Sequence, residues 1–90
     1  MVSQAELDAA ELERRWRTVY QLLSALERSA KVLDTDQYAR DDMQEYIEGG
    51  FETVQSIPEL ETDPKKLSTL PALKQQFQTY QDLLNKDEQQ

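Results

Sequence analysis

The sequence contains no cysteine and no histidine. The lack of cysteine excludes disulfide bridges, and the lack of both residues removes the commonest zinc ligands, thiol nucleophiles and the usual general base. A glycine-rich phosphate-binding loop is excluded as well, because the only two glycines are the pair Gly49-Gly50. We therefore expect a protein that is not an enzyme, with no catalytic residues, no metal site and no cofactor.

Turn-forming residues and long apolar runs are also scarce. Two glycines and three prolines in 90 residues are too few for an all-β fold, which needs many turns. No apolar run approaches the roughly 20 residues that span a membrane, and residues 1–6 lack the basic start and apolar stretch of a secretory signal. The sequence predicts a cytoplasmic protein that does not enter membranes.

Acidic residues in the segment 34–45 partly match a calcium-binding loop. Aspartates and a glutamate stand at the first, third, ninth and twelfth positions of that template. The fifth and sixth positions are Tyr38 and Ala39, although the template needs an oxygen ligand and a glycine there. We interpret these acids as residues that cap a helix.

Residues 4–33 carry the strongest pattern, an apolar repeat with alternating spacings of four and three residues. This repeat is typical of a helix that packs against other helices. The ladder consists of Ala5, Ala9, Leu12, Trp16, Val19, Leu23, Leu26, Ala30 and Leu33. Ser3 and Glu6 form a capping box at its start. A helix of thirty residues is about 45 Å long, whereas a compact chain of this size is only about 25–30 Å across. The helix must run along an elongated bundle, project from it, or pair with another chain.

Two further helices follow from the pattern of apolar residues. We expect the second at about 36–57 and the third at about 69–86, separated by a loop at 58–68 in which Asp63-Pro64 starts a short helical turn. The last residues, 86–90, read as a polar tail. Gly49-Gly50 lies within the second helix and indicates a kink, a break or a close approach of two helices.

The fold class is therefore all-α, with residues 1–90 as a single domain. We expect an elongated three-helix bundle, or a helical hairpin plus a third helix, with the first helix as its central element. The ladder is longer than the other two helices can cover, so we also expect a homodimer that resembles a coiled coil.

The net charge of -8 is concentrated in residues 34–63, which contain ten acidic residues and one basic residue, Arg40. Such a field repels nucleic acids and anionic lipids and attracts basic protein surfaces. We expect no nucleic-acid partner and no membrane partner. The candidate partner-binding residues of this segment are Asp41, Asp42, Glu45, Glu48 and Glu52.

The function predicted from the sequence is a non-catalytic helical module for protein–protein interaction, such as an adaptor, a regulator or an assembly factor. Trp16, Tyr20 and Leu23 are the candidate binding residues on the first helix, because aromatic side chains often anchor interfaces. One alternative is an acidic inhibitor or nucleic-acid mimic that binds a basic protein surface through residues 34–63. Another is a small chaperone for a helical chain.

Overall fold

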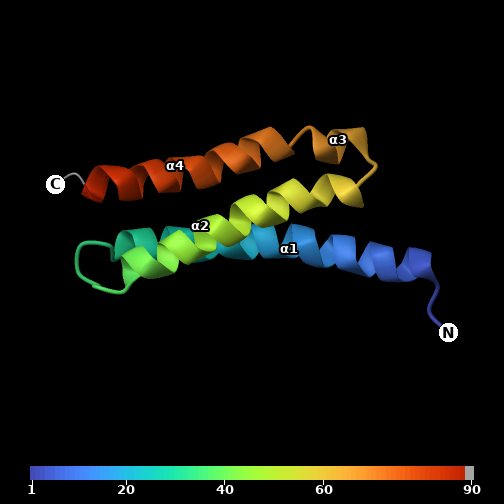
Figure 1. Cartoon of the computed structure of the whole chain (residues 1–90), viewed down its shortest axis with the longest axis horizontal. Helices are drawn as coiled ribbons and strands as arrows, with labels where there is room; N and C mark the ends of the chain where they lie inside the picture. The colour runs from blue at the N-terminus through green and yellow to red at the C-terminus, as the bar shows by residue number, and fades with distance from the viewer. Residues whose placement is uncertain (89–90) are drawn as a thin grey trace.

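The structure is a computed structural model that describes residues 1–88. Three long helices dominate it, and no strand occurs among the described residues, so the all-α prediction is confirmed (Figure 1). The helical elements in chain order are α1 (Gln4–Lys31), α2 (Ala39–Ser56), the 3-10 helix η1 (Ile57–Glu59), α3 (Pro64–Leu67) and α4 (Leu70–Glu88). Within residues 1–88, none of these helices is long and apolar enough to cross a membrane.

Local hydrogen bonds explain where the first two long helices begin and end. The Ser3 hydroxyl accepts a hydrogen bond from the Glu6 amide and caps α1, as the sequence predicts. α1 ends at Lys31, earlier than expected, because residues 32–36 close into a turn in which the Asp36 amide donates to the Val32 carbonyl over 2.8 Å. α2 begins later than expected, because Asp36 caps the turn before it by accepting from the Tyr38 amide.

The predicted loop at 58–68 contains the short helical turn expected after Asp63, which is α3, but it also contains most of η1, which the sequence did not predict. Asp63 starts α3 as its sequence suggests, because its carboxylate accepts a hydrogen bond from the Lys65 amide and Pro64 occupies the first turn. The predicted tail at 86–90 is also corrected, because α4 continues through Glu88. Its final two residues, 89–90, lie outside the described part.

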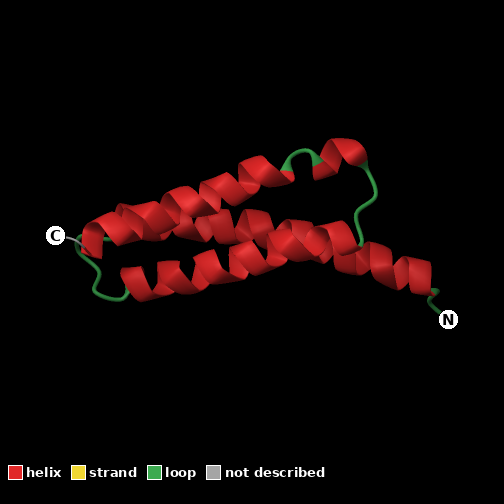
Figure 2. Cartoon of the chain, turned by 45° about the horizontal axis from the view of Figure 1, so that its top comes forward, coloured by secondary structure: helices red, strands yellow, loops and turns green. Residues whose placement is uncertain are grey.

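α2, rather than α1, is the central helix of the bundle. α1 and α2 form an antiparallel hairpin, and α4 returns antiparallel to α2, so that α2 contacts both neighbours (Figures 1 and 2). α1 and α4 contact each other much less. The resulting molecule is elongated, with extents of 53 × 27 × 15 Å. The expectation of α1 as the central element fails because α2 is the helix that shares apolar faces with both others.

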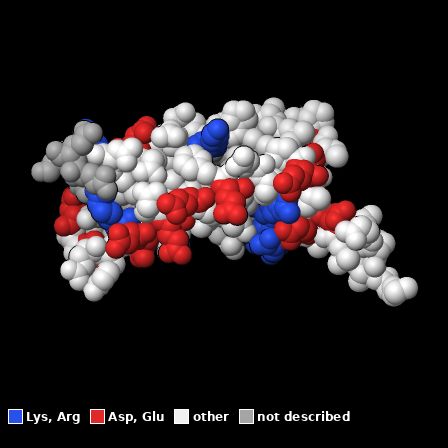
Figure 3. Space-filling model, viewed as in Figure 1, with Lys and Arg blue, Asp and Glu red and all other residues white. Residues whose placement is uncertain are grey.

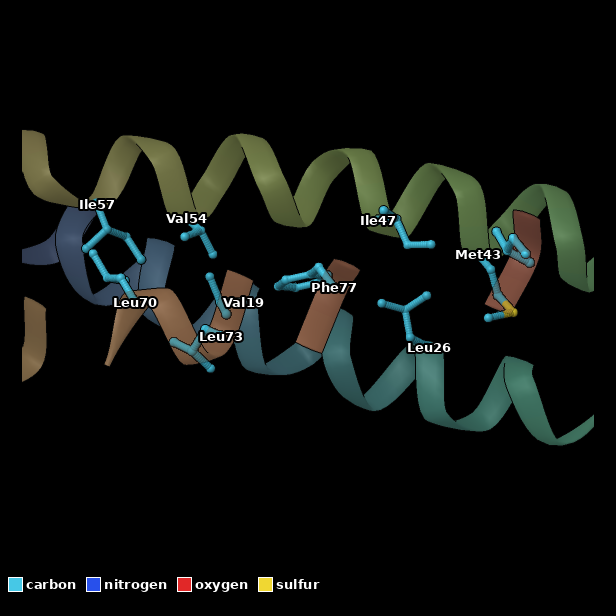
Figure 4. Close-up of a cluster of buried hydrophobic side chains, with 10 residues drawn as sticks. Val19, Leu26, Met43, Ile47, Val54, Ile57, Leu70, Leu73 and Phe77 are labelled. Carbon is cyan, nitrogen blue, oxygen red and sulfur yellow. The ribbon is translucent and has the colours of Figure 1, made fainter. Parts of the chain in front are cut away.

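The core is a single line of apolar side chains between the three long helices (Figure 4). Burial of these side chains from water provides most of the stability of such a bundle. The buried residues of this cluster are Val19, Leu26, Met43, Ile47, Val54, Ile57, Leu70, Leu73, Phe77 and Leu84.

The glycine pair lies in an unbroken stretch of α2 and marks a close approach. A Cβ atom built on Gly50 would lie 2.1 Å from Cε1 of Phe77, a ring on α4 that is fully buried. Gly50 therefore makes room for Phe77. A Cβ atom on Gly49 would be 3.6 Å from the Leu22 side chain, which is ordinary contact. Of the three readings left open by the sequence, the structure selects close packing.

The N-terminal end of α1 extends beyond the end of α2, whose last residue, Ser56, lies beside Arg15 (Figure 2). Of the apolar ladder, only Val19 and Leu26 are fully buried, and Ala5 and Ala9 are exposed. The remaining members are partly buried against the core: Leu12, Trp16, Leu23, Ala30 and Leu33. The ladder is thus longer than the core of this chain.

Candidate functional site

A groove lies where α1 extends past α2, and α3 forms its other side. Its volume is about 610 Å³. We call it the α1 groove. One wall is the ladder side of α1 and the other is the turn of α3 together with Thr69, which lies directly before α4. The lining residues are Ala9, Leu12, Glu13, Trp16 and Tyr20 from α1, and Lys65, Lys66 and Thr69 from the opposite side.

Trp16 joins the two walls of the α1 groove. Its indole Nε1 donates a hydrogen bond to Oε1 of Glu61 over 2.8 Å. Oε2 of Glu61 accepts from the backbone amides of Thr62 and Asp63, at 3.1 and 3.2 Å. This carboxylate therefore ties the segment before α3 to the side of α1, and it holds the indole in one orientation at the groove.

Glu61 is the one polar residue that is buried in the described part of the chain, with 7% of its surface exposed. Burial opposes ionisation of its carboxyl group. The hydrogen bonds from the Asp63 amide, the Trp16 indole and the Thr62 amide, together with the charge of Lys66, outweigh this effect and lower the pKa of Glu61. The group is thus a carboxylate at neutral pH, and its charge is compensated by donors.

Tyr20 continues the aromatic surface along α1, one turn after Trp16. The two rings are stacked with centroids 6.5 Å apart and an angle of 20° between their planes. Trp16 is half-buried, whereas Tyr20 keeps 53% of its surface exposed. Together they present an apolar surface at the bundle end of the α1 groove, and such rigid aromatic groups are favoured at binding sites.

An ionic cluster fixes α1 where α2 ends. Arg15 donates from Nη1 to the Ser56 carbonyl at 2.8 Å and to the Glu59 carboxylate at 3.2 Å. Its Nε binds Glu11, which also binds Arg14. These guanidinium groups, Arg14 first, lower the pKa of Glu11 to about 2. The cluster locks the direction in which α1 leaves the bundle.

The acidic residues predicted from the sequence lie together on α2. Acidic side chains form a row along this helix (Figure 3). All five are exposed, and within residues 1–88 none of them forms an ion pair. They are Asp41, Asp42, Glu45, Glu48 and Glu52. Only Glu48 receives a side-chain hydrogen bond, from Gln44 over 3.3 Å.

The structure separates the candidate residues of α1. Trp16 and Tyr20 line the α1 groove, whereas Leu23 is half-buried and packs against the core cluster. The sequence reasoning did not identify Glu61, Lys65 and Lys66 as site residues. Asp63-Pro64 signalled the short helix that carries the lysines. Its position against α1, however, depends on the hydrogen bond between Trp16 and Glu61, which joins residues 45 apart in the sequence.

Comparisons of the chain with protein-family models, with curated proteins and with solved structures find no significant match. The functional argument therefore depends on the geometry of the α1 groove and on the charges around it.

Proposed function

We propose that this chain is a non-catalytic protein–protein interaction module that binds an amphipathic helix of a second polypeptide chain in the α1 groove. The observation that carries this proposal is the extension of the apolar ladder of α1 beyond α2, with exposed Ala9 beside half-buried Leu12 and Trp16. A helix with an apolar stripe can lie along such a groove and bury the stripe against it.

The shape of the α1 groove supports a helical ligand. Ladder positions on α1 repeat every three and four residues, and this spacing matches the side chains of a second helix that crosses at a shallow angle. Ala9 is small and allows the second backbone to approach closely. Trp16, oriented by Glu61, supplies a large apolar surface, so an incoming side chain meets a preformed anchor.

The charges at the edge of the α1 groove favour a ligand with acidic residues beside its apolar stripe. Lys65 and Lys66 are exposed on α3, and within residues 1–88 neither side chain forms an ion pair. A chaperone that holds a helix of another chain would use the same groove in the same way.

The test is site-specific photo-crosslinking at position 12 in living cells that contain the natural partner. A matched pair of variants locates the binding surface, because Ala9→Lys places a charge in the α1 groove and Ala10→Lys places it on the adjacent outer face of the same helix. We expect one crosslinked helical segment that is retained in Ala10→Lys and lost in Ala9→Lys. Crosslinks that both variants retain, or that both lose, would contradict the proposal.

The acidic row of α2 is a second candidate surface, with an inhibitor of a basic protein as its function. This second function is favoured by a difference in ion pairing between the acidic residues of α1 and those of α2. Glu11 and Glu13 of α1 are paired with arginines of the same helix, whereas the five α2 carboxylates are exposed and form no ion pair within the described part of the chain. Binding of a basic partner through this row should weaken strongly as salt rises from about 50 to 500 mM. Affinity that is independent of salt would contradict this second function.

A further inference from the structure

We infer that the helix bound in the α1 groove is α1 of a second copy of this chain, so that the N-terminal halves of two α1 helices pair antiparallel about a two-fold axis near residues 10 and 11. This inference depends on the proposed function, because it names the occupant of the same groove. It is argued from the sizes of the ladder residues and from the charges beside them.

The ladder residues outside the core are complementary in size when two copies pair antiparallel. If Ala9 of one copy lies opposite Leu12 of the other, the spacing of the ladder places Ala5 opposite Trp16 of the second copy. Each small side chain then faces a large one, and the symmetry repeats both contacts on the other side of the axis. Alternating small and large residues in this way fills the space between helices.

The parallel arrangement lacks this fit. It would set Ala5 against Ala5, Ala9 against Ala9 and Trp16 against Trp16, which leaves gaps at one end and crowding at the other. It would also place Asp8 of one copy near Glu13 of the other, because these positions flank the apolar seam in a parallel pair. The parallel pair therefore also brings two carboxylates together at Glu13, without the small-to-large fit that favours the antiparallel pair.

The charges around the α1 groove also fit the antiparallel pair. This pairing places Glu6 of one copy next to Glu13 of the other, which is a wall residue of the groove. Two carboxylates at that point repel each other, but Lys65 and Lys66 of α3 line the same groove. The two cations offset the two anions. A second copy thus supplies the acidic residue beside the apolar stripe that the groove favours.

Only residues 5–16 of each chain take part in this pairing, so the interface is short, and association should be measured from about 1 μM to about 1 mM protein. Sedimentation velocity over this range compares the wild type with Ala9→Lys and Ala10→Lys. We expect a dimer for the wild type and Ala10→Lys, and a monomer for Ala9→Lys. A wild type that stays monomeric throughout, or equal dimerisation of both variants, overturns the inference.

A charge reversal tests the antiparallel direction. Glu6→Lys should weaken the dimer at least tenfold, because it puts a third cation beside Lys65 and Lys66 of the other copy. Adding Lys65→Glu and Lys66→Glu to this variant should restore association. The comparison is made between Glu6→Lys with and without the two lysine reversals, because both proteins lack the Glu6 carboxylate of the α1 capping box. No weakening, or no restoration, overturns the antiparallel pairing.

The inference and the proposed function can fail separately. A chain that is monomeric at the highest concentration but still crosslinks from position 12 to a helix of another protein contradicts the self-pairing and leaves the proposed function intact. A dimer that Ala9→Lys abolishes supports both. A monomer with no crosslink in the wild type contradicts both.

Discussion

Gly50 is the residue at which α2 comes closest to α4. The ring of Phe77 occupies the space where a Cβ atom on Gly50 would lie, and that ring is fully buried. Gly50→Ala should gain about 1 kcal/mol in helix propensity and lose more from overpacking, which typically costs about 1–3 kcal/mol. We expect a net loss of stability in urea unfolding.

Gly49→Ala is the matched control, because its new methyl group would meet only an ordinary contact with Leu22. It gains the same helix propensity without the overpacking, so this variant should be more stable than the wild type by up to about 1 kcal/mol. Two glycine variants that shift the urea midpoint in the same direction would show that the Phe77 contact does not control α2 packing.

Glu61 links α1 to the segment before α3, and its titration should make the stability of the fold depend on pH. Its pKa is lower in the folded chain than the value of 4.5 expected for a free side chain. The carboxylate therefore stabilises the folded state at pH values above 4.5, and this contribution is lost as the pH falls through the lower, folded pKa. Glu61→Gln keeps an acceptor for the indole but removes the charge.

The measurement is the free energy of unfolding of wild type and Glu61→Gln between pH 7 and pH 2, with Trp16 fluorescence as the probe. The wild type should be the more stable at neutral pH, and its advantage should shrink below pH 4.5. The difference isolates Glu61, because Glu11, whose pKa is about 2, contributes equally to both proteins. An advantage that stays constant down to pH 2 would show that the charge of Glu61 has no part in folding.

The two halves of α1 contribute differently to the stability of the fold. From Val19 onward the helix contributes to the core, and before Leu12 it has little to pack against within residues 1–88. Leu23→Asp should cost at least about 2 kcal/mol, because it places a carboxylate against the core cluster. Leu7→Asp, at an exposed position near the helix N-terminus, should change stability by less than about 0.5 kcal/mol. Urea unfolding of both variants tests this, and similar losses would mean that the N-terminal half also supports the fold.

Helix boundaries and helix contacts differ in how well the sequence predicts them. The apolar spacing predicted three long helices, and Ser3 and Asp63 marked two of the helix starts, because these signals act between residues three or four apart. The central position of α2 could not be predicted in this way, since it depends on which apolar faces meet. The same holds for the α1 groove, whose far wall is held by the contact of Trp16 with Glu61. The local sequence pattern thus predicts the helices, whereas contacts between residues far apart in the sequence determine the α1 groove.

The shape of the whole molecule offers a separate check on self-pairing. One chain is 53 Å long and has a Cα radius of gyration of 15.3 Å. Two chains that overlap only through residues 5–16 would share about 18 Å of helix, so the pair should be roughly 1.7 times as long as one chain. Small-angle X-ray scattering at low and high concentration measures this directly. A maximum dimension that stays near the length of one chain at high concentration would rule out an end-to-end pair.

The position of α2 between α1 and α4 has a consequence for the rate and order of folding. Most contacts between the long helices join elements that are consecutive along the chain, and such local contacts allow fast folding. The α1–α2 hairpin is complete by residue 56, so during synthesis it can form while α4 is still inside the ribosome. Until α4 arrives, Gly50 leaves a vacant apolar site that only the ring of Phe77 will later fill. The newly made hairpin therefore exposes apolar residues of α2 that α4 covers in the complete chain.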